Sequence, residues 1–451
     1  MRMARLMAGT ALAGFLLTVP ASSLAAETNA QLEARVRDLE AALASVKAEM
    51  AANREAARAE AAKGEQRIVQ LEARPAAPAA PPAPPPSEPG FRVGNTLVSF
   101  GGYVKLDAMV SDFGRADPPG GDLLRDFYLP GAIPVTGADE DAKVDLNARQ
   151  TRLWFTTSST LGGHKVASRV EGDFQVLPGS GDARTTNPAN FSLRRAYVTV
   201  DNWLFGQEWS NFQNIAVLPE TADYIGPTEG TVFVRQAQVR YTHGPFSMSV
   251  ENPETTVTPF GGGVRILADD AGLPDFTARF DLKRPFGEFA LTGLVRQLAL
   301  HQGAIDDKAT GWGVSASGKI KVGSKNDLRL MVTTGEGIGR YVGLNFANDA
   351  VLDAGGDLKP IPLTAGFVAY RHFWTDTVRS TFMYSAQVVD NPRTLTGLAA
   401  NESASSLHGN LVWSPFKGFD IGAEYLVGER KVESGADGDL KRLQAFVKYG
   451  F

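Results

Sequence analysis

Lys441-Arg-Leu-Gln-Ala-Phe-Val-Lys-Tyr-Gly-Phe451 ends the chain, and it alternates between apolar and polar residues. Successive side chains of a strand point to opposite faces, so apolar residues at every second position share one face. These residues are Leu443, Ala445, Val447, Tyr449 and Phe451. An apolar face that ends in aromatic residues is typical of a transmembrane barrel strand, which places aromatic side chains at the membrane interface. An edge strand of a soluble β-sandwich alternates in the same way, so the rest of the chain has to decide between the two.

Composition narrows the class of protein. The 451 residues include no cysteine, which excludes a disulfide framework and cysteine-based zinc or iron–sulfur sites. The formal net charge of −5 gives no electrostatic reason to expect nucleic-acid binding. The mean hydropathy is slightly polar. That value excludes a bundle of membrane helices but not a barrel, whose strands are only half apolar.

The N-terminal residues predict export and a stalk. Residues 1–26 have the charged, apolar and small-residue order of a signal peptide, and the apolar core is short for a membrane anchor. Residues 27–74 carry apolar positions spaced 4-3-4-3-4 from Leu32 to Met50, which predicts an α-helical coiled coil in the periplasm. A single charged surface helix is the alternative. Residues 75–90 are proline-rich and predict an extended linker of roughly 45 Å.

Residues 91–451 read as alternating segments of about ten residues, as barrel strands do. Shifting residues 165–176 by one position would move Lys165 and Arg169 into lipid, at roughly 2–4 kcal/mol each near the midplane. Seven tight connectors are expected at 161–164, 201–202, 243–245, 284–287, 322–326, 374–376 and 414–418. Eight longer ones are expected near 114–146, 177–190, 211–231, 252–275, 302–309, 335–362, 390–403 and 430–439. The prediction is therefore an all-β fold, a 16-stranded antiparallel transmembrane β-barrel with an N-terminal coiled coil.

The third long connector is more apolar than an exposed loop should be, so we expect it to fold into the lumen as a constriction. Its acids Glu220 and Asp223 would then face basic side chains of the wall. By alternation, the basic candidates for the constriction are Arg152, Lys165, Arg169, Arg195, Arg235, Arg240 and Arg279; alternation leaves open whether Arg194 or Arg195 points inward, and also the direction of Arg235. A basic lining favours anions, because guanidinium groups bind carboxylate and phosphate in bidentate fashion. The alternative is that these charges pair with lumenal acids and only hydrate the pore.

Several motifs together resemble the DcaP-like outer-membrane porin family. They are the segments 100–107, 148–152, 195–197, 206–212, 218–221 and 233–241, and the likeness covers the mature chain. The resemblance implies a sixteen-stranded trimeric porin with a periplasmic coiled coil, associated with uptake of dicarboxylates and other anions. The long loops carry no recognisable motif, so the resemblance does not fix the solute.

We therefore expect an outer-membrane diffusion porin for small anionic solutes, with its stalk in the periplasm and membrane lipid around the barrel. A phosphate-selective porin and a structural tether from the outer membrane to the cell wall or a periplasmic partner remain alternatives. No catalytic constellation is evident, since the five histidines are scattered, and no cofactor, metal ion or nucleic acid is expected.

Overall fold

The computed structural model describes residues 90–138, 140–175 and 189–451, together with six isolated helical positions between Arg37 and Glu55. The chain divides into two compact units, Met1–Glu88 and Pro89–Phe451. Apart from those six positions and Gly90, the expected signal peptide, coiled coil and linker lie outside the described residues. Their assignment stays a prediction.

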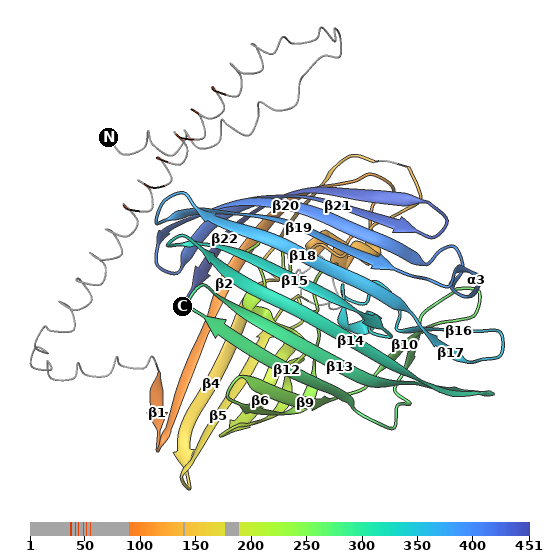
Figure 1. The fold of residues 1–451 in the computed structure, drawn as a ribbon, viewed down its shortest axis with the longest axis horizontal. Helices are drawn as coiled ribbons and strands as arrows, with labels where there is room; N and C mark the ends of the chain where they lie inside the picture. The colour runs from red at the N-terminus through yellow and green to blue at the C-terminus, as the bar shows by residue number, and fades with distance from the viewer. Residues whose placement is uncertain are drawn as a thin grey trace, which may run out of the picture. The chain divides into compact units, whose positions relative to one another are not determined.

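Sixteen antiparallel strands of the second unit form a closed barrel (Figure 1). Each strand pairs with its neighbours in the ring, and the last strand pairs with the first. The strands are β2 (Thr96–Phe113), β4 (Arg152–Leu161), β5 (His164–Asp173), β6 (Ser192–Val200), β7 (Trp203–Trp209), β8 (Arg235–His243), β9 (Phe246–Glu251), β12 (Asp275–Arg284), β13 (Gly287–Gln302), β14 (Ile305–Val322), β15 (Asn326–Glu336), β18 (Pro362–Phe373), β19 (Val378–Val389), β20 (Asn401–Phe416), β21 (Phe419–Val432) and β22 (Asp437–Gly450). The predicted strand number is confirmed.

Shorter elements belong to the long connectors or flank β2. Strands β1 (Phe91–Val93) and β3 (Lys143–Asn147) pair with β2. A separate four-stranded sheet contains β10 (Thr255–Thr258), β11 (Ile266–Ala268), β16 (Ala350–Leu352) and β17 (Leu358–Pro360). The helices are α2 (Leu123–Asp126), α3 (Arg393–Thr396), η1 (Pro130–Ala132), η2 (Ile215–Val217) and η3 (Gly339–Tyr341). Among the described residues, no helix is long and apolar enough to cross a bilayer.

Strand β22 closes the barrel in the register that its alternation requires. It pairs with β2 from Tyr103↔Gly450 to Phe113↔Leu440. The side chains of Leu443 and Tyr449 are about half exposed on the outer face, whereas those of Arg442 and Gln444 are buried inside. The apolar outer face and polar inner face predicted for the closing segment are therefore confirmed.

The connectors follow the predicted short and long order with two exceptions. All seven tight connectors lie between consecutive strands as expected. The connector expected at 302–309 is only a turn at 303–304, and the one expected at 430–439 shrinks to 433–436. The first prediction was wrong because Asp306 and Lys308 make the end of the β13–β14 hairpin look like a loop, whereas Leu298, Leu300 and Ile305 pack under the four-stranded sheet.

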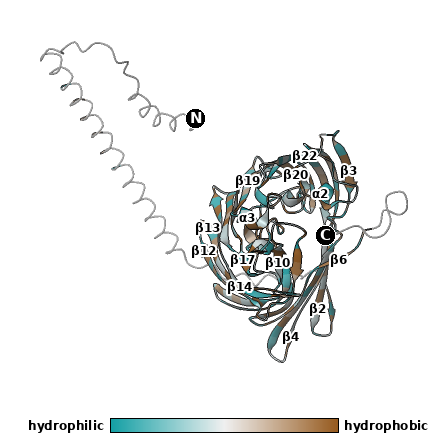
Figure 2. Ribbon diagram, turned by 90° about the vertical axis from the view of Figure 1, so that its right-hand side faces the viewer, coloured by the Kyte–Doolittle hydropathy of each residue, from teal (hydrophilic) through white to brown (hydrophobic). Residues whose placement is uncertain are grey.

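We number the connectors at the long-loop end L1 to L8, and three of them matter for the lumen: L1 (114–151), L3 (210–234) and L6 (337–361). Viewed from the long-loop end, helices α2 and α3 and strands β10 and β17 are drawn within the outline of the ring (Figure 2).

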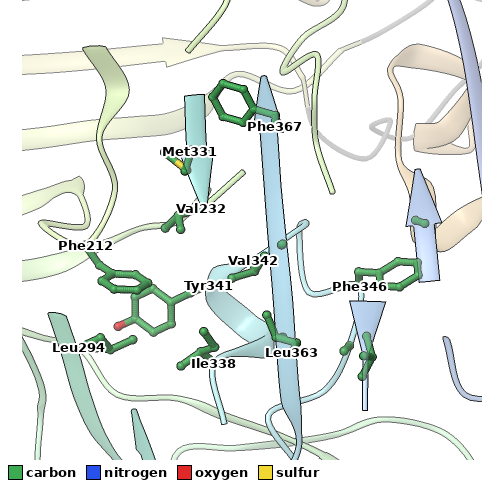
Figure 3. Close-up of a cluster of buried hydrophobic side chains, with 14 of the residues drawn as sticks. Phe212, Val232, Leu294, Met331, Ile338, Tyr341, Val342, Phe346, Leu363 and Phe367 are labelled. Carbon is green, nitrogen blue, oxygen red and sulfur yellow. The ribbon is translucent and has the colours of Figure 1, made fainter. Parts of the chain in front are cut away.

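One side of the lumen is filled by an apolar core rather than by water. Phe212 and Val232 of L3 pack with Ile338, Tyr341 and Val342 of L6 (Figure 3). Inward side chains of the wall complete the cluster, among them Leu294, Met331, Leu363 and Phe367. We call this set the apolar cluster. It explains why these wall strands carry apolar residues on the face that a water-filled barrel would make polar.

Candidate functional site

Loop L3 folds into the barrel, and basic side chains of the wall hold its main chain. Arg279 Nη1 donates to Gln213 O at 2.8 Å, and Lys105 Nζ donates to Ala222 O at 2.6 Å. Arg240 and Arg329 donate in the same way to the carbonyl groups of Trp209 and Leu218. Part of the basic lining that the sequence predicts therefore fixes the loop instead of standing free in the lumen.

The two acids of L3 that were predicted from the sequence, Glu220 and Asp223, have different surroundings. Glu220 faces the wall, where Nε and Nη2 of Arg379 on β19 donate hydrogen bonds to its two carboxylate oxygens at 2.7 and 2.6 Å. Asp223 is buried and accepts hydrogen bonds from the main-chain N–H groups of Tyr128, Ile225 and Gly226, at 2.8, 3.0 and 3.1 Å. Asp223 thus ties L3 to L1 and shapes the turn of the loop.

Five arginines gather on the opposite wall, formed by β4, β5, β6 and β8. We call them the arginine cluster: Arg152, Arg169, Arg194, Arg195 and Arg235. Three carboxylates lie among them, those of Glu171, Asp173 and Glu208. The site therefore carries a formal excess of two positive charges.

The three carboxylates are buried and saturated with hydrogen bonds. Glu171 accepts from Arg169, Arg194 and Arg195, at 2.7 to 3.4 Å. Asp173 accepts from Arg152, Arg194 and the hydroxyl of Tyr224, at 3.1, 2.7 and 3.0 Å. Glu208 accepts two hydrogen bonds from Arg195, at 2.7 and 2.5 Å. Their side chains are at most 5% exposed, whereas those of Arg152, Arg169 and Arg195 keep 17–21%. The charged side chains of the site that solvent reaches are therefore arginines.

Arg235 differs from the other members of the cluster. Within residues 90–138, 140–175 and 189–451, no oxygen accepts a hydrogen bond from it, and its buried Nη1 has no partner. Its guanidinium lies over the rings of Trp209 and Phe233, at 4.8 and 5.9 Å from their centroids. Cation–π contact compensates a desolvated charge only in part, so donor capacity remains at this position.

A β-bulge brings two consecutive arginines to the same wall. The β5–β6 register runs Glu171↔Arg195 and then Gly172↔Leu193, which leaves Arg194 as the extra residue. A bulge interrupts alternation, and here Leu193 points outward while Arg194 and Arg195 both contact Glu171.

The remaining predicted residues lie outside the cluster. Arg240 interacts electrostatically with both Glu208 and Arg279. Arg279 lines a cavity of about 730 Å³ toward the short-turn end, below η2, together with Lys283 and Lys319. Lys165 is exposed beside the β4–β5 turn. The structure thus brings Arg152, Arg169, Arg195 and Arg235 together, and it places Glu220, Asp223, Arg240, Arg279 and Lys165 elsewhere along the lumen or its mouth.

Sequence reasoning missed three members of this site. Glu208, Trp209 and Tyr224 were not singled out. Glu208 and Trp209 end strand β7, just before L3, and Tyr224 lies within L3. The tripeptide Gln207-Glu208-Trp209 gives a signal that was available, because a carboxylate and an indole at a strand end can both meet an arginine. No sequence signal indicated Tyr224, because its contact with Asp173 depends on the course of L3 through the lumen.

The comparisons with known proteins agree with this architecture. The family model of the DcaP outer membrane protein matches residues 125–451. The crystal structure of the outer membrane channel DcaP of Acinetobacter baumannii superposes with a TM-score of 0.68 at 26% sequence identity, and covers 81% of this chain and 100% of that one. No curated protein sequence matches the chain.

Two other solved barrels are more distant. Outer-membrane expressed OmpT of Vibrio cholerae has a TM-score of 0.48 at 11% identity, over 80% of this chain and 99% of that one. The Salmonella typhi OmpF complex with daunomycin has a TM-score of 0.48 at 10% identity, over 79% and 98%.

The family match spans most of the chain and includes every strand that forms the arginine cluster. Members of this family are channels, so the expectation that the protein is not an enzyme is confirmed. Short turns of such barrels face the periplasm and long loops face outward. The chain therefore belongs to the DcaP outer membrane protein family, and it is a channel-forming β-barrel of the outer membrane.

Proposed function

We propose that the barrel passes small anionic solutes, dicarboxylates in particular, along the wall that carries the arginine cluster. The observation that carries this proposal is the difference in solvent exposure between the acidic and the basic side chains of the cluster. All three carboxylates are buried and hydrogen-bonded, whereas the charged side chains that solvent reaches are those of arginines. A passing anion would meet donors without displacing an internal acceptor.

The spread of basic residues supports a path rather than a single binding site. Below the arginine cluster, Arg240 and Arg279 lead toward the cavity near the short turns. That cavity is lined by four basic residues, Arg279, Lys283, Arg284 and Lys319, against the two acids Asp281 and Glu288. A series of weak basic positions lets an anion enter and leave, which a diffusion channel requires.

Two carboxylates on one solute suit several guanidiniums on one wall, and this favours dicarboxylates over monocarboxylates. Phosphate is the competing solute, because it also accepts bidentate hydrogen bonds from arginine. The charges of the cluster do not distinguish the two, so the experiment has to.

The test is a planar-bilayer recording of the purified full-length protein under a KCl gradient. The expected reversal potential has the sign of anion preference. Titration should then reduce the chloride current at a lower concentration of succinate than of butyrate, which has a similar length but one carboxylate. Block by phosphate alone would favour the phosphate-selective alternative, and cation selectivity would contradict the proposal.

We also propose that the protein is a homotrimer whose residues 27–74 form a periplasmic coiled coil. The heptad spacing and the family resemblance support this. Because the heptads are few, the barrels should hold the trimer together. Deleting residues 27–90 should therefore leave trimers on native gels with unchanged conductance. Monomers after the deletion would assign assembly to the stalk, and loss of envelope integrity would favour the tether alternative.

A further inference from the structure

Three connectors meet at the long-loop end and enclose a second polar pocket. They are L4 (252–274), L6 and L7 (390–400). Gly261 N donates to Leu395 O at 2.7 Å, and Asn348 Nδ2 donates to Thr258 Oγ1 at 2.7 Å. Helix α3 of L7 contacts β16 of L6, and both are drawn at this end of the barrel (Figure 1). These contacts surround a cavity of about 160 Å³.

Two arginines line this pocket, and oxygens of uncharged groups hold each of them. Arg265 donates through Nε to Asn348 Oδ1 at 2.5 Å and through Nη2 to Asn345 O at 2.7 Å. Arg430 donates through Nε to Asn401 Oδ1 at 2.8 Å and through Nη1 to Ile133 O at 2.6 Å. Each guanidinium thus has a fixed orientation and one remaining terminal nitrogen, Nη1 of Arg265 and Nη2 of Arg430.

Neither arginine forms an ion pair with any carboxylate in the part of the chain that the structure describes. The nearby acids are already engaged. Asp349 is paired with Arg296 at 2.9 Å and also accepts from the N–H groups of Thr256 and Arg340. Glu433 is paired with Arg393 and accepts from Asn391 Nδ2 at 2.8 Å. This contrasts with most arginines of the lumen, which have a carboxylate partner.

We propose that the pocket between Arg265 and Arg430 is a binding site for a free small oxyanion, a carboxylate or a phosphate, at the outer mouth of the channel. The exposed Arg265 and the half-buried Arg430, neither of which has an ion-pair partner among the described residues, make an anion a favourable occupant. A volume of 160 Å³ corresponds to about five water molecules, which suits a small solute. The site lies apart from the arginine cluster and does not depend on its selectivity.

The absence of cysteine allows a local test, because a single introduced thiol can carry a reporter. Leu398 is 60% exposed in L7 and does not line the pocket. Leu398→Cys, labelled with an environment-sensitive fluorophore, is titrated with succinate and with inorganic phosphate at constant ionic strength, in detergent free of lipopolysaccharide. The expected result is a saturable signal for one or both anions. The order of the two half-saturation concentrations distinguishes carboxylate from phosphate.

Three variants in the labelled background locate the site. Arg265→Gln with Arg430→Gln should raise half-saturation at least about tenfold. Arg265→Gln alone should raise the half-saturation concentration by a smaller factor. Because Arg265 is exposed, this single variant should still fold, so it serves as the test if the double variant does not. Lys417→Gln removes the same charge from an exposed turn at the other end, outside both cavities, and should change nothing.

The outcomes separate this inference from the proposed function. A signal that does not saturate, or an equal weakening by Lys417→Gln, would overturn the loop site. Arg152→Gln with Arg235→Gln should leave the fluorescence titration unchanged while it alters ion selectivity. If that double variant abolishes the fluorescence signal, the reporter responds to the arginine cluster and the loop site is wrong.

Discussion

The two sides of the lumen are built from the same kind of strand, but one side is packed with apolar side chains and the other carries charged side chains. On one side, Phe212 and Tyr341 pack face to edge, with ring centroids 5.9 Å apart, inside an apolar cluster that excludes water (Figure 3). On the other side, five arginines surround three carboxylates and keep part of their surface open. The apolar cluster fills one side of the lumen. Solutes therefore have to pass along the other side, where the charges of the arginine cluster can act on them. Loops L3 and L6 therefore position the path as much as the wall does.

The largest effect should come from opening the closed side. Phe212→Ala removes a fully buried ring from the apolar cluster, at a cost of about 3–5 kcal/mol to the seating of L3. We expect a lower thermal unfolding midpoint and a larger, noisier single-channel conductance with anion preference retained. Phe382→Ala is the matched control, because Phe382 is a half-exposed outward phenylalanine of β19. A normal conductance in Phe212→Ala would show that the apolar cluster does not limit the pore.

The next effect should come from the open side and touch selectivity alone. Arg235→Gln removes the guanidinium that lacks an acidic partner, so the unfolding midpoint should barely change. One charge about 4 Å from a passing ion is worth about 1 kcal/mol in water, or a fivefold change in permeability ratio. Reversal potentials of Arg235→Gln and Lys417→Gln measure it, because Lys417 is an exposed residue of the β20–β21 turn that does not line the cavity. The difference should shrink in 1 M salt, where screening acts over roughly 3 Å. Equal shifts in both variants would point to net charge instead of position.

The smallest effect should come from the mouth. Lys165 is exposed beside a short turn, where water and salt screen its charge. Lys165→Gln should change the permeability ratio by less than about twofold in the same recordings. A change as large as that of Arg235→Gln would move the selective position from the arginine cluster to the periplasmic mouth.

The sequence alone predicts the barrel, because a strand that faces lipid must carry apolar residues at every second position. Alternation in the closing segment and in residues 165–173 fixes which side chains face outward, and the structure agrees. Alternation fails where both faces are apolar. Strand β18 buries Leu363, Ala365 and Phe367 inside while Val368 faces lipid, so its pattern does not reveal that L6 packs on it.

The site could be predicted only in part. Arg152 and Arg169 follow from period-two alternation. Arg194 does not, because the bulge in β6 is a property of pairing with β5. The roles of Asp223 and Tyr224 depend on the course of L3 through the lumen, which has no local sequence signal.

The most direct test of the two-sided lumen is the rate at which a negatively charged thiol reagent modifies single cysteines during current recording. Tyr197→Cys lies on the arginine side, where Tyr197 neighbours Arg195, and Met331→Cys lies in the apolar cluster. We expect rapid modification of Tyr197→Cys with a fall in anion current, and no modification of Met331→Cys in the folded barrel. Equal rates at the two positions would show that the lumen does not have one open and one closed side.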